Sequence, residues 1–382
     1  MNRTNSIGLF MVLALALLAP SCTPEAKTGQ EGEMTFDSKL ALRVWVLGEE
    51  EEIPDYIGST PASNPLAIPK CRWWAVEPLM GVSVADVINE AKVQPIRGLK
   101  LTGANDIYHR PGLCPPFTDA DLAPLSGWPN LQVLSSCGAE ITDGGLVHLK
   151  GLKELRWLGL GSTQITDAGL VHLKDLKELR QLILGGTNIT DGGLAYLKEL
   201  TGLQSVIIWH TQITDAGLVH LKDLKALQTL NLGGTNITNA GLAALKESEG
   251  LRELNLDSTQ ITDAGLAHLK GLKALRTLEL SCDTGITDAG VAFLKQLKEL
   301  RELSLMHARI TDAGLAHIEG LKALQVLRLD ETETTDAGLV HLEELTGLRV
   351  LSLAETKITD AGLVRLKELK DLRCLFLGHT KI

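Results

Sequence analysis

The sequence is poor in aromatic residues, which make up 4% of its 382 residues. Most of the core must therefore be aliphatic, and each of the 6 tryptophans can be considered on its own. Positive charge is also scarce, since 37 Lys and Arg face 47 Asp and Glu for a net charge of -10. A general nucleic-acid or anionic-lipid binder needs the opposite balance, so we expect no nucleic-acid partner.

The common catalytic signatures are missing as well. The sequence contains no G-x-S-x-G, H-E-x-x-H or C-x-x-C motif, and no glycine-rich phosphate loop between a strand and a helix. We therefore expect no enzymatic activity, no cofactor and no metal. A hydrolase hidden in residues 34–116 is the remaining catalytic alternative.

Only one long hydrophobic run is present, over residues 7–19, and it is too short to span a bilayer comfortably. With Arg3 before it, this run predicts a signal peptide over residues 1–21. The following Leu18-Ala19-Pro20-Ser21-Cys22 resembles a bacterial lipoprotein signal, which implies lipidation of Cys22 and anchoring to a membrane facing the periplasm or cell surface. Ordinary secretion with cleavage near Ser21 is the alternative. The polar residues 22–33 are typical of a flexible tether.

The main feature that is present is a repeat. Ile-Thr-Asp-Ala-Gly-Leu recurs at Ile165, Ile213, Ile261, Ile310 and Ile358, with related copies between them, and the period is 24 residues. A fixed period of this length means that each unit buries its apolar face only by stacking on its neighbours. We therefore expect an array of 11 units over residues 117–382, preceded by an irregular N-terminal cap over residues 34–116. Within that cap, residues 84–91 have a helical pattern and Leu99-Lys100-Leu101 favours a first strand.

Each unit has a recognisable internal order. Thr166 is placed to cap a short helix, and Asp167 lies at its positive end. Leucines then follow every third residue, and Leu182 and Leu184 alternate as in a strand. This order predicts an α/β solenoid, with a curved parallel sheet inside and short helices outside. The recurring Gly169 suggests that neighbouring backbones approach too closely for a side chain, and the column that includes Thr163 is expected to bond turn carbonyls.

The I-T-D-x-G-L signature resembles the cysteine-containing subclass of leucine-rich repeats, found in F-box adaptors and in large bacterial repeat families. The resemblance covers about two thirds of the chain, but the subclass's strand-end cysteine is present only as Cys137 and Cys282. It implies the leucine-rich repeat architecture and a bacterial protein. No F-box-like helical segment precedes the array, so we take the similarity as evidence for the fold rather than for function.

The variable positions between the strand leucines are expected to face the concave surface, where solenoids bind most ligands. The candidate partner-binding residues are Trp157, Gln181, Ile183, Ile207, Trp209, His210, Glu253, Asp257, Glu302 and Asp330. The first half of this series is apolar and aromatic, which favours an interface anchor, packing beneath the cap, or no role. The second half is acidic, which favours either a basic peptide or simple solubility.

Two further features leave alternatives open. Cys71 and Cys114 both lie in the cap region, where an oxidising envelope would favour a disulfide between them. A column of histidines begins with His148 and His172 but is interrupted, which favours exposed helix positions over a metal ladder. The apolar edge near Leu375 and Leu377 has no closing segment in this sequence, which suggests a truncated chain, a homodimer through that edge, or local instability.

Taken together, these patterns predict a non-catalytic exported protein that binds a protein or peptide through its concave face. The alternatives are a structural spacer or assembly component of the envelope, and a substrate-recognition adaptor of the F-box-like type.

Overall fold

The computed structural model describes residues 34–36, 40, 42–47, 55–60, 66–68, 73–78, 82–91, 96–101, 117–282 and 285–382. The expected signal peptide, the lipidation site Cys22, the tether, and both cysteines of the expected disulfide, Cys71 and Cys114, lie outside these residues. No helix among the described residues is long and apolar enough to cross a membrane.

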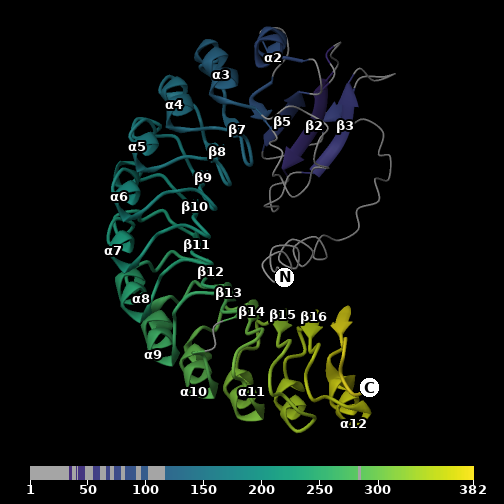
Figure 1. Ribbon diagram of the computed structural model, residues 1–382. Coiled ribbons are helices and arrows are strands. Elements are labelled where there is room, and N and C mark those ends of the chain that lie inside the picture. Colours follow the sequence, from purple (N-terminus) through teal and green to yellow (C-terminus); the bar gives the residue numbers. More distant parts are fainter. Residues whose placement is uncertain are drawn as a thin grey trace.

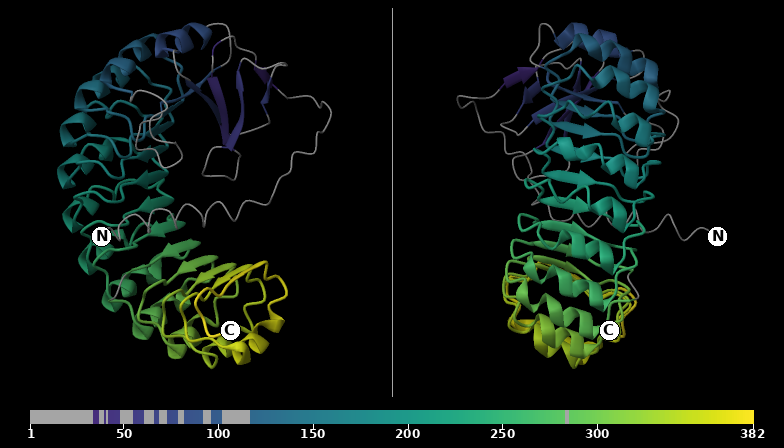
Figure 2. Two further views of the ribbon diagram at one scale, coloured as in Figure 1. Left: turned by 45° about the vertical axis from the view of Figure 1, so that its right-hand side comes forward. Right: turned by 90° about the vertical axis from the view of Figure 1, so that its left-hand side faces the viewer.

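The array forms a curved solenoid in which the strands line the inner side and the helices the outer side (Figure 1). The left view in Figure 2 shows the same division between strands and helices. The array strands are β7 Val133–Ser135, β8 Trp157–Gly159, β9 Gln181–Ile183, β10 Ser205–Ile207, β11 Thr229–Asn231, β12 Glu253–Asn255, β13 Thr277–Glu279, β14 Glu302–Ser304, β15 Val326–Arg328, β16 Val350–Ser352 and β17 Cys374–Phe376.

The helices on the outer side are short. The α-helices are α3 Asp119–Leu122, α4 Asp143–Leu146, α5 Asp167–Leu170, α6 Asp191–Leu194, α7 Asp215–Leu218, α8 Asn239–Leu245, α9 Asp263–Leu266, α10 Asp288–Val291, α11 Asp312–Ile318 and α12 Asp360–Leu363. The 3-10 helices are η1 Ala123–Gly127, η2 Val147–Leu149, η3 Leu197–Glu199, η4 Ala267–Gly271, η5 Ala292–Gln296, η6 Gly338–Leu342 and η7 Val364–Glu368.

The region expected to form the cap adds strands to the same sheet. Its described elements are β1 Met34–Phe36, β2 Leu42–Leu47, β3 Asp55–Thr60, β4 Leu66–Ile68, β5 Trp73–Pro78, α2 Val84–Ala91 and β6 Gly98–Lys100. β2 pairs antiparallel with β3 and β5, β5 pairs parallel with β6, and β6 pairs parallel with β7. The sheet thus has 15 strands in the order β17 to β5, then β2 and β3. The helix over residues 84–91 and the first parallel strand were predicted, whereas β2, β3 and β5 were not.

Leucine columns form the core. In the unit that contains α5, Leu170, Leu173, Leu176 and Leu179 have no exposed surface, and neither does Leu182 on β9. Each fully buried leucine contributes about 1.5–3 kcal/mol relative to an exposed one. Since the neighbouring units supply the opposite wall of each layer, no unit has this core by itself.

An aspartate clasp, a contact that the sequence did not predict, joins consecutive units. Asp143 Oδ1 accepts a hydrogen bond from Thr166 N at 2.8 Å, and its Oδ2 accepts one from Thr166 Oγ1 at 2.6 Å. Thr166 also caps its own helix, because its hydroxyl oxygen accepts from Ala168 N. The clasp therefore ties the start of one helix to the start of the next. The other Asp–Thr pairs are Asp119–Thr142, Asp167–Thr190, Asp191–Thr214, Asp215–Thr238, Asp263–Thr287, Asp288–Thr311, Asp312–Thr335 and Asp336–Thr359.

The clasp corrects our explanation of the repeated glycine. A Cβ atom on Gly169 would lie 2.4 Å from Asp143 Oδ1 and 2.9 Å from Leu146 Cδ1. The close neighbours are thus side chains of the preceding unit, and the expectation of backbone contact was wrong. The expected threonine column is confirmed, since the buried Thr163 Oγ1 donates to Leu160 O at 2.6 Å and later units repeat this bond.

Candidate functional site

Three rows of side chains build the concave face. Because the parallel strands pair in register, the first residues of neighbouring strands form one row, which runs from Trp157 through Gln181, Ser205, Thr229, Glu253 and Thr277 to Glu302. The third residues form a second row that contains Ile183, Ile207, Asn255 and Glu279. Residues two positions after each strand, such as Trp209, form the third row. Neighbouring strands lie about 4.8 Å apart, so side chains within a row are in reach of one another.

A fourth row follows in the turns after the strands. His210 has a φ of 49° and His307 a φ of 59°, which is the left-handed region that side chains with a Cβ adopt at a cost of about 1 kcal/mol. His307 Nδ1 lies 2.9 Å from Glu331 Oε2, so this row joins neighbouring turns by side-chain contacts. The exposed His210 belongs to this row rather than to a strand.

The aromatic segment is the part of the concave face over β8 to β10, and it contains Trp157, Trp209 and Ile183. A Cβ atom on Gly185 would lie 2.4 Å from Trp209 Cε2, so this indole ring lies directly against the turn of the preceding unit. Trp157 covers Gly159 in a similar way, with its Cη2 atom 2.6 Å from the position of a Cβ. Both tryptophans are half-buried rather than exposed, as are Gln181, Ile183 and Ile207.

Contact with glycine backbone restricts the motion of these rings. The ring of His210 meets that of Trp209 edge-on, with centroids 5.5 Å apart and an interplanar angle of 87°. A large aromatic surface held in one orientation binds a partner with little further loss of entropy. The aromatic segment is therefore preorganised for an apolar contact.

The acidic segment comprises Glu253, Asp257, Glu279 and Glu302 on β12 to β14 and the turn after β12. Asp257 is 9% exposed, whereas the other three carboxyl side chains are half-buried. Asp257 Oδ1 accepts a hydrogen bond from Ser281 N at 2.6 Å, and Asn255 Nδ2 donates to both Asp257 and Glu279. These contacts hold two carboxyl groups against each other at the base of the concave face.

Burial in this segment changes the proton affinity of the carboxyl groups. Burial and the nearby Asp257 carboxylate raise the pKa of Glu279 to about 7, against an opposing effect of the Arg328 guanidinium. Burial also raises the pKa of Asp257, and it raises the pKa of Glu302, with Glu279 and Glu253 acting in the same direction. The charge of this surface therefore changes near neutral pH.

Asp330 lies farther along the array and is 9% exposed. Its Oδ1 atom accepts hydrogen bonds from Ala354 N at 3.0 Å and from the Ser352 hydroxyl. These hydrogen bonds hold the Asp330 carboxylate against the turn of the next unit. Among the sequence candidates, the structure thus brings Trp157, Gln181, Ile183, Ile207, Trp209 and His210 together on β8 to β10 and the turn after β10. It groups Glu253, Asp257 and Glu302 separately on β12 to β14 and the turn after β12. Asp330 lies beyond them, in the turn after β15, the strand that pairs with β14.

Among the described residues, no group of three or more His, Cys, Asp or Glu side chains is suited to hold a metal ion. In the histidine column, the His341 Nδ1 atom lies 3.1 Å from Glu319 Oε2 on the outer side of the array. This contact is an ordinary helix-to-helix pair between neighbouring units.

Sequence reasoning overlooked a set of charged side chains that follow the helices. Lys177 Nζ lies 3.6 Å from Glu199 Oε2 of the next unit. One unit earlier, Lys153 Nζ lies 4.0 Å from Asp175 Oδ2 in the same arrangement. The sequence contains a signal for these ion pairs, because each lysine precedes its acidic partner by 22 positions. These residues lie on a second surface of the molecule, distinct from the concave face.

The comparisons with known proteins agree with this architecture. Two leucine-rich repeat family models match residues 201–261 and residues 298–318. The solved structure of an internalin from Listeria monocytogenes is similar over 78% of this chain and 88% of that one, at 22% identity and a TM-score of 0.55. One chain of the mouse RP105/MD-1 complex is similar over 71% of this chain and 48% of its own length, at 19% identity and a TM-score of 0.53. The search of curated proteins found no match.

These identities are too low to transfer a partner or an activity, and the similarity concerns the fold. Stacked leucine columns, a parallel inner sheet, outer helices and the matched repeats agree with one another. The chain folds as a leucine-rich repeat solenoid.

Proposed function

We propose that this protein is a non-catalytic recognition protein that binds a protein or peptide partner through its concave face. The observation that carries the proposal is the aromatic segment, in which the rings of Trp157 and Trp209 occupy the space beside Gly159 and Gly185 that a side chain there would need. The solved leucine-rich repeat structures with similar folds include the mouse RP105/MD-1 complex, which is consistent with protein recognition.

The partner we expect is an extended segment that crosses several strands. It would place an apolar side chain on the aromatic segment and a more polar portion toward β12 to β14. Rigid indole rings provide most of the energy in such an interface, while surrounding contacts exclude water. Gln181, Ile183 and Ile207 lie between or beside the two rings and complete this surface.

The test is partner capture from a cell-envelope extract with the native protein and a Trp157→Ala/Trp209→Ala variant. A matched control carries Tyr196→Ala and Phe293→Ala, which remove two exposed rings from the outer side. A partner that is lost only with the tryptophan variant supports the concave face. Equal capture by all three folded proteins would reject the aromatic segment and favour the spacer alternative.

We further propose that the protein is exported and anchored to the envelope through a lipid on Cys22. The support is the hydrophobic run over residues 7–19 followed by the lipoprotein-like residues before Cys22. Membrane fractionation of a Cys22→Ala variant tests this. Release of the variant into the soluble fraction is the expected result, whereas equal membrane retention contradicts lipidation.

We also propose that two copies pair through the edge formed by β17. Leu375 and Phe376 on this strand are 36% and 41% exposed. Sedimentation velocity of the purified protein should then show a dimer that Phe376→Glu converts to a monomer. A native protein that sediments as a monomer at all accessible concentrations contradicts this pairing.

A further inference from the structure

Three of the lysines that follow the outer helices, Lys153, Lys177 and Lys322, form an ion pair with an acidic residue of the next unit. Lys177 Nζ donates to the backbone oxygen of Glu199 at 3.0 Å and lies 3.6 Å from that residue's carboxylate. Lys322 similarly contacts the carboxylate of Glu344. In each pair, the lysine of one unit is neutralised by an acidic residue that the next unit supplies.

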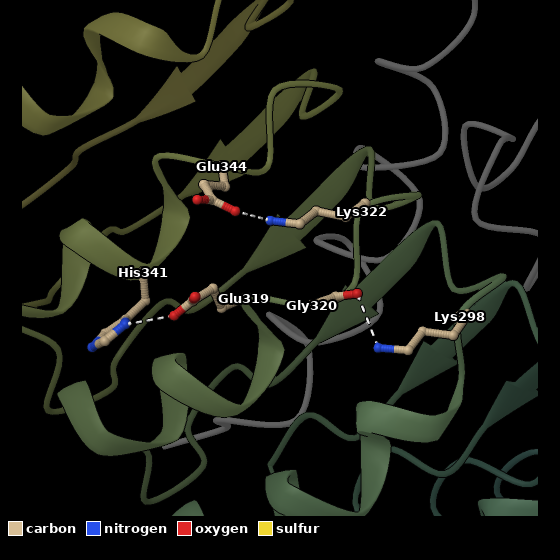
Figure 3. A network of polar contacts seen from close by, with 6 residues as sticks. All are labelled: Lys298, Glu319, Gly320, Lys322, His341 and Glu344. Atoms are coloured by element: carbon tan, nitrogen blue, oxygen red, sulfur yellow. Dashed lines mark hydrogen bonds and ion pairs between the residues drawn. The ribbon is translucent and has the colours of Figure 1, made fainter.

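Two consecutive units, those of Lys273 and Lys298, have a lysine at this position but no acidic residue at the corresponding position of the next unit. Figure 3 shows Lys322 paired with Glu344, whereas Lys298 reaches only the backbone oxygen of Gly320, at 3.1 Å. For Lys273, the corresponding position in the next unit is Gln296, which carries no charge. Both lysines are exposed, and within the described part of the chain neither has an ion pair.

Further basic side chains surround these two lysines. Arg301 N donates to Arg276 O at 2.7 Å, which places the two arginines side by side on successive units. We call the full set the basic patch: Lys270, Lys273, Arg276, Lys295, Lys298 and Arg301. Glu299 is the one acidic residue within the segments 270–276 and 295–301. In a chain with a net charge of -10, this is a strong local excess of positive charge.

We propose that the basic patch binds an acidic peptide segment of a partner protein, whose carboxylates occupy the places that Asp and Glu of the next unit fill elsewhere in the array. The chemistry of the partner follows from the chain itself, because Asp175, Glu199 and Glu344 already place carboxylates beside the equivalent lysines. An extended segment with acidic residues at alternate positions presents its carboxylates on one face, about 7 Å apart.

The patch belongs to a surface separate from the concave face. Lys270 and Lys295 lie on η4 and η5, on the outer side of the array, and the remaining members follow these helices. An open pocket lined by Lys246, Glu247, Ala267, His268, Lys270 and Gly271 adjoins its edge. A partner held here leaves the aromatic segment accessible.

The test measures fluorescence anisotropy of a labelled ten-residue peptide of alternating Glu and Ser as the full chain is added. The decisive variant is Gln296→Glu/Gly320→Glu, which supplies the missing carboxylates from within the array. A Cβ on Gly320 would meet only the mobile end of Lys298, at 3.1 Å, so the substitution is tolerated. The matched control is Thr201→Glu/Thr346→Glu, which adds the same charge at exposed positions of other units.

We expect the decisive variant to bind the peptide at least tenfold more weakly than the native protein, with an unchanged or higher Tm, and the control to bind within about twofold. Peptide affinity should also fall as salt rises, since the contacts are exposed ion pairs. Equal affinity of the native protein and the decisive variant would overturn the proposal. So would binding to phosphatidylglycerol vesicles without binding to the peptide, because the occupant would then be a membrane.

Discussion

Protonation of the acidic segment should make the solenoid more stable in mild acid than at alkaline pH. The pKa of Glu279 is about 7 in the folded protein, against an ordinary value of 4.5. A folded state that binds a proton more tightly than the unfolded state is stabilised where that proton is present. The contribution of Glu279 is therefore complete below pH 4.5 and is lost as the pH rises through about 7.

The size of this effect follows from the two pKa values. Their difference corresponds to about 3 kcal/mol between the ends of the window, at about 1.4 kcal/mol per unit of pKa. Asp257 and Glu302 act in the same direction, because burial raises the pKa of both. Asp257 and Glu279 face each other, so their protons are released as a pair.

Glu279→Gln is the decisive substitution, since glutamine keeps the shape of a protonated glutamate and does not titrate. Hydrogen exchange of the β12 to β14 amides should be measured at pH 5 and pH 8, after correction for the intrinsic pH dependence of exchange. A repeat protein can open locally, so local protection is more informative than a single global transition.

The native protein should lose protection in these strands at pH 8, whereas the variant should lose much less. Glu355→Gln serves as the control and should behave like the native protein, because Glu355 is exposed and lies in the fourth row, in the turn after β16. Equal loss of protection in the native protein and in Glu279→Gln would refute the reasoning, as would greater protection of the native strands at pH 8.

Three substitutions probe the array itself. Asp191→Ala removes both hydrogen bonds to Thr214 and should lower the free energy of unfolding by about 2–3 kcal/mol in urea titration; a loss below 0.5 kcal/mol would reject the clasp as a stabilising contact. Asn239 Nδ2 donates to the Thr262 hydroxyl, and this threonine makes no side-chain cap bond to its own helix. Asn239→Asp should restore the clasp and the cap bond and raise the free energy of unfolding by about 1 kcal/mol. A lower urea midpoint would contradict this. Ser136 is fully buried and its hydroxyl has no hydrogen-bond partner among the described residues, so Ser136→Ala should raise the Tm, corresponding to about 1 kcal/mol; a fall in Tm would indicate a bond that the structure does not contain.

The repeat made much of the fold predictable. Leucines at every third position and the threonine caps specify helix, core and strand within each unit, and the structure places Leu170 and Thr166 as expected. The role of Asp143 was not predictable in the same way. It bonds a threonine 23 residues later, and a periodic sequence does not show whether an acidic residue serves its own helix or the next one.

The sequence predicted which face of the sheet the candidate site residues lie on, but not the burial and contacts of their side chains. The alternation around the strand leucines placed Trp209 on the concave face, but only the structure shows that the ring occupies the space beside Gly185 and is half-buried. Burial and the Asp257 carboxylate of the preceding unit raise the pKa of Glu279, while the Arg328 guanidinium, two strands away, opposes them. In a stacked array, such environments depend on which residues of successive units fall side by side.

Site-specific photo-crosslinking tests the central proposal most directly. A photoreactive phenylalanine analogue is placed either at Gln181, between the two tryptophans on the concave face, or at Tyr196 on the outer side. Irradiation in cells is followed by detection of adducts of higher mass. Recognition through the concave face predicts a discrete protein adduct from position 181 that disappears when Trp157 and Trp209 are replaced by alanine. An adduct from position 196 alone, or one from position 181 that survives both replacements, would contradict it.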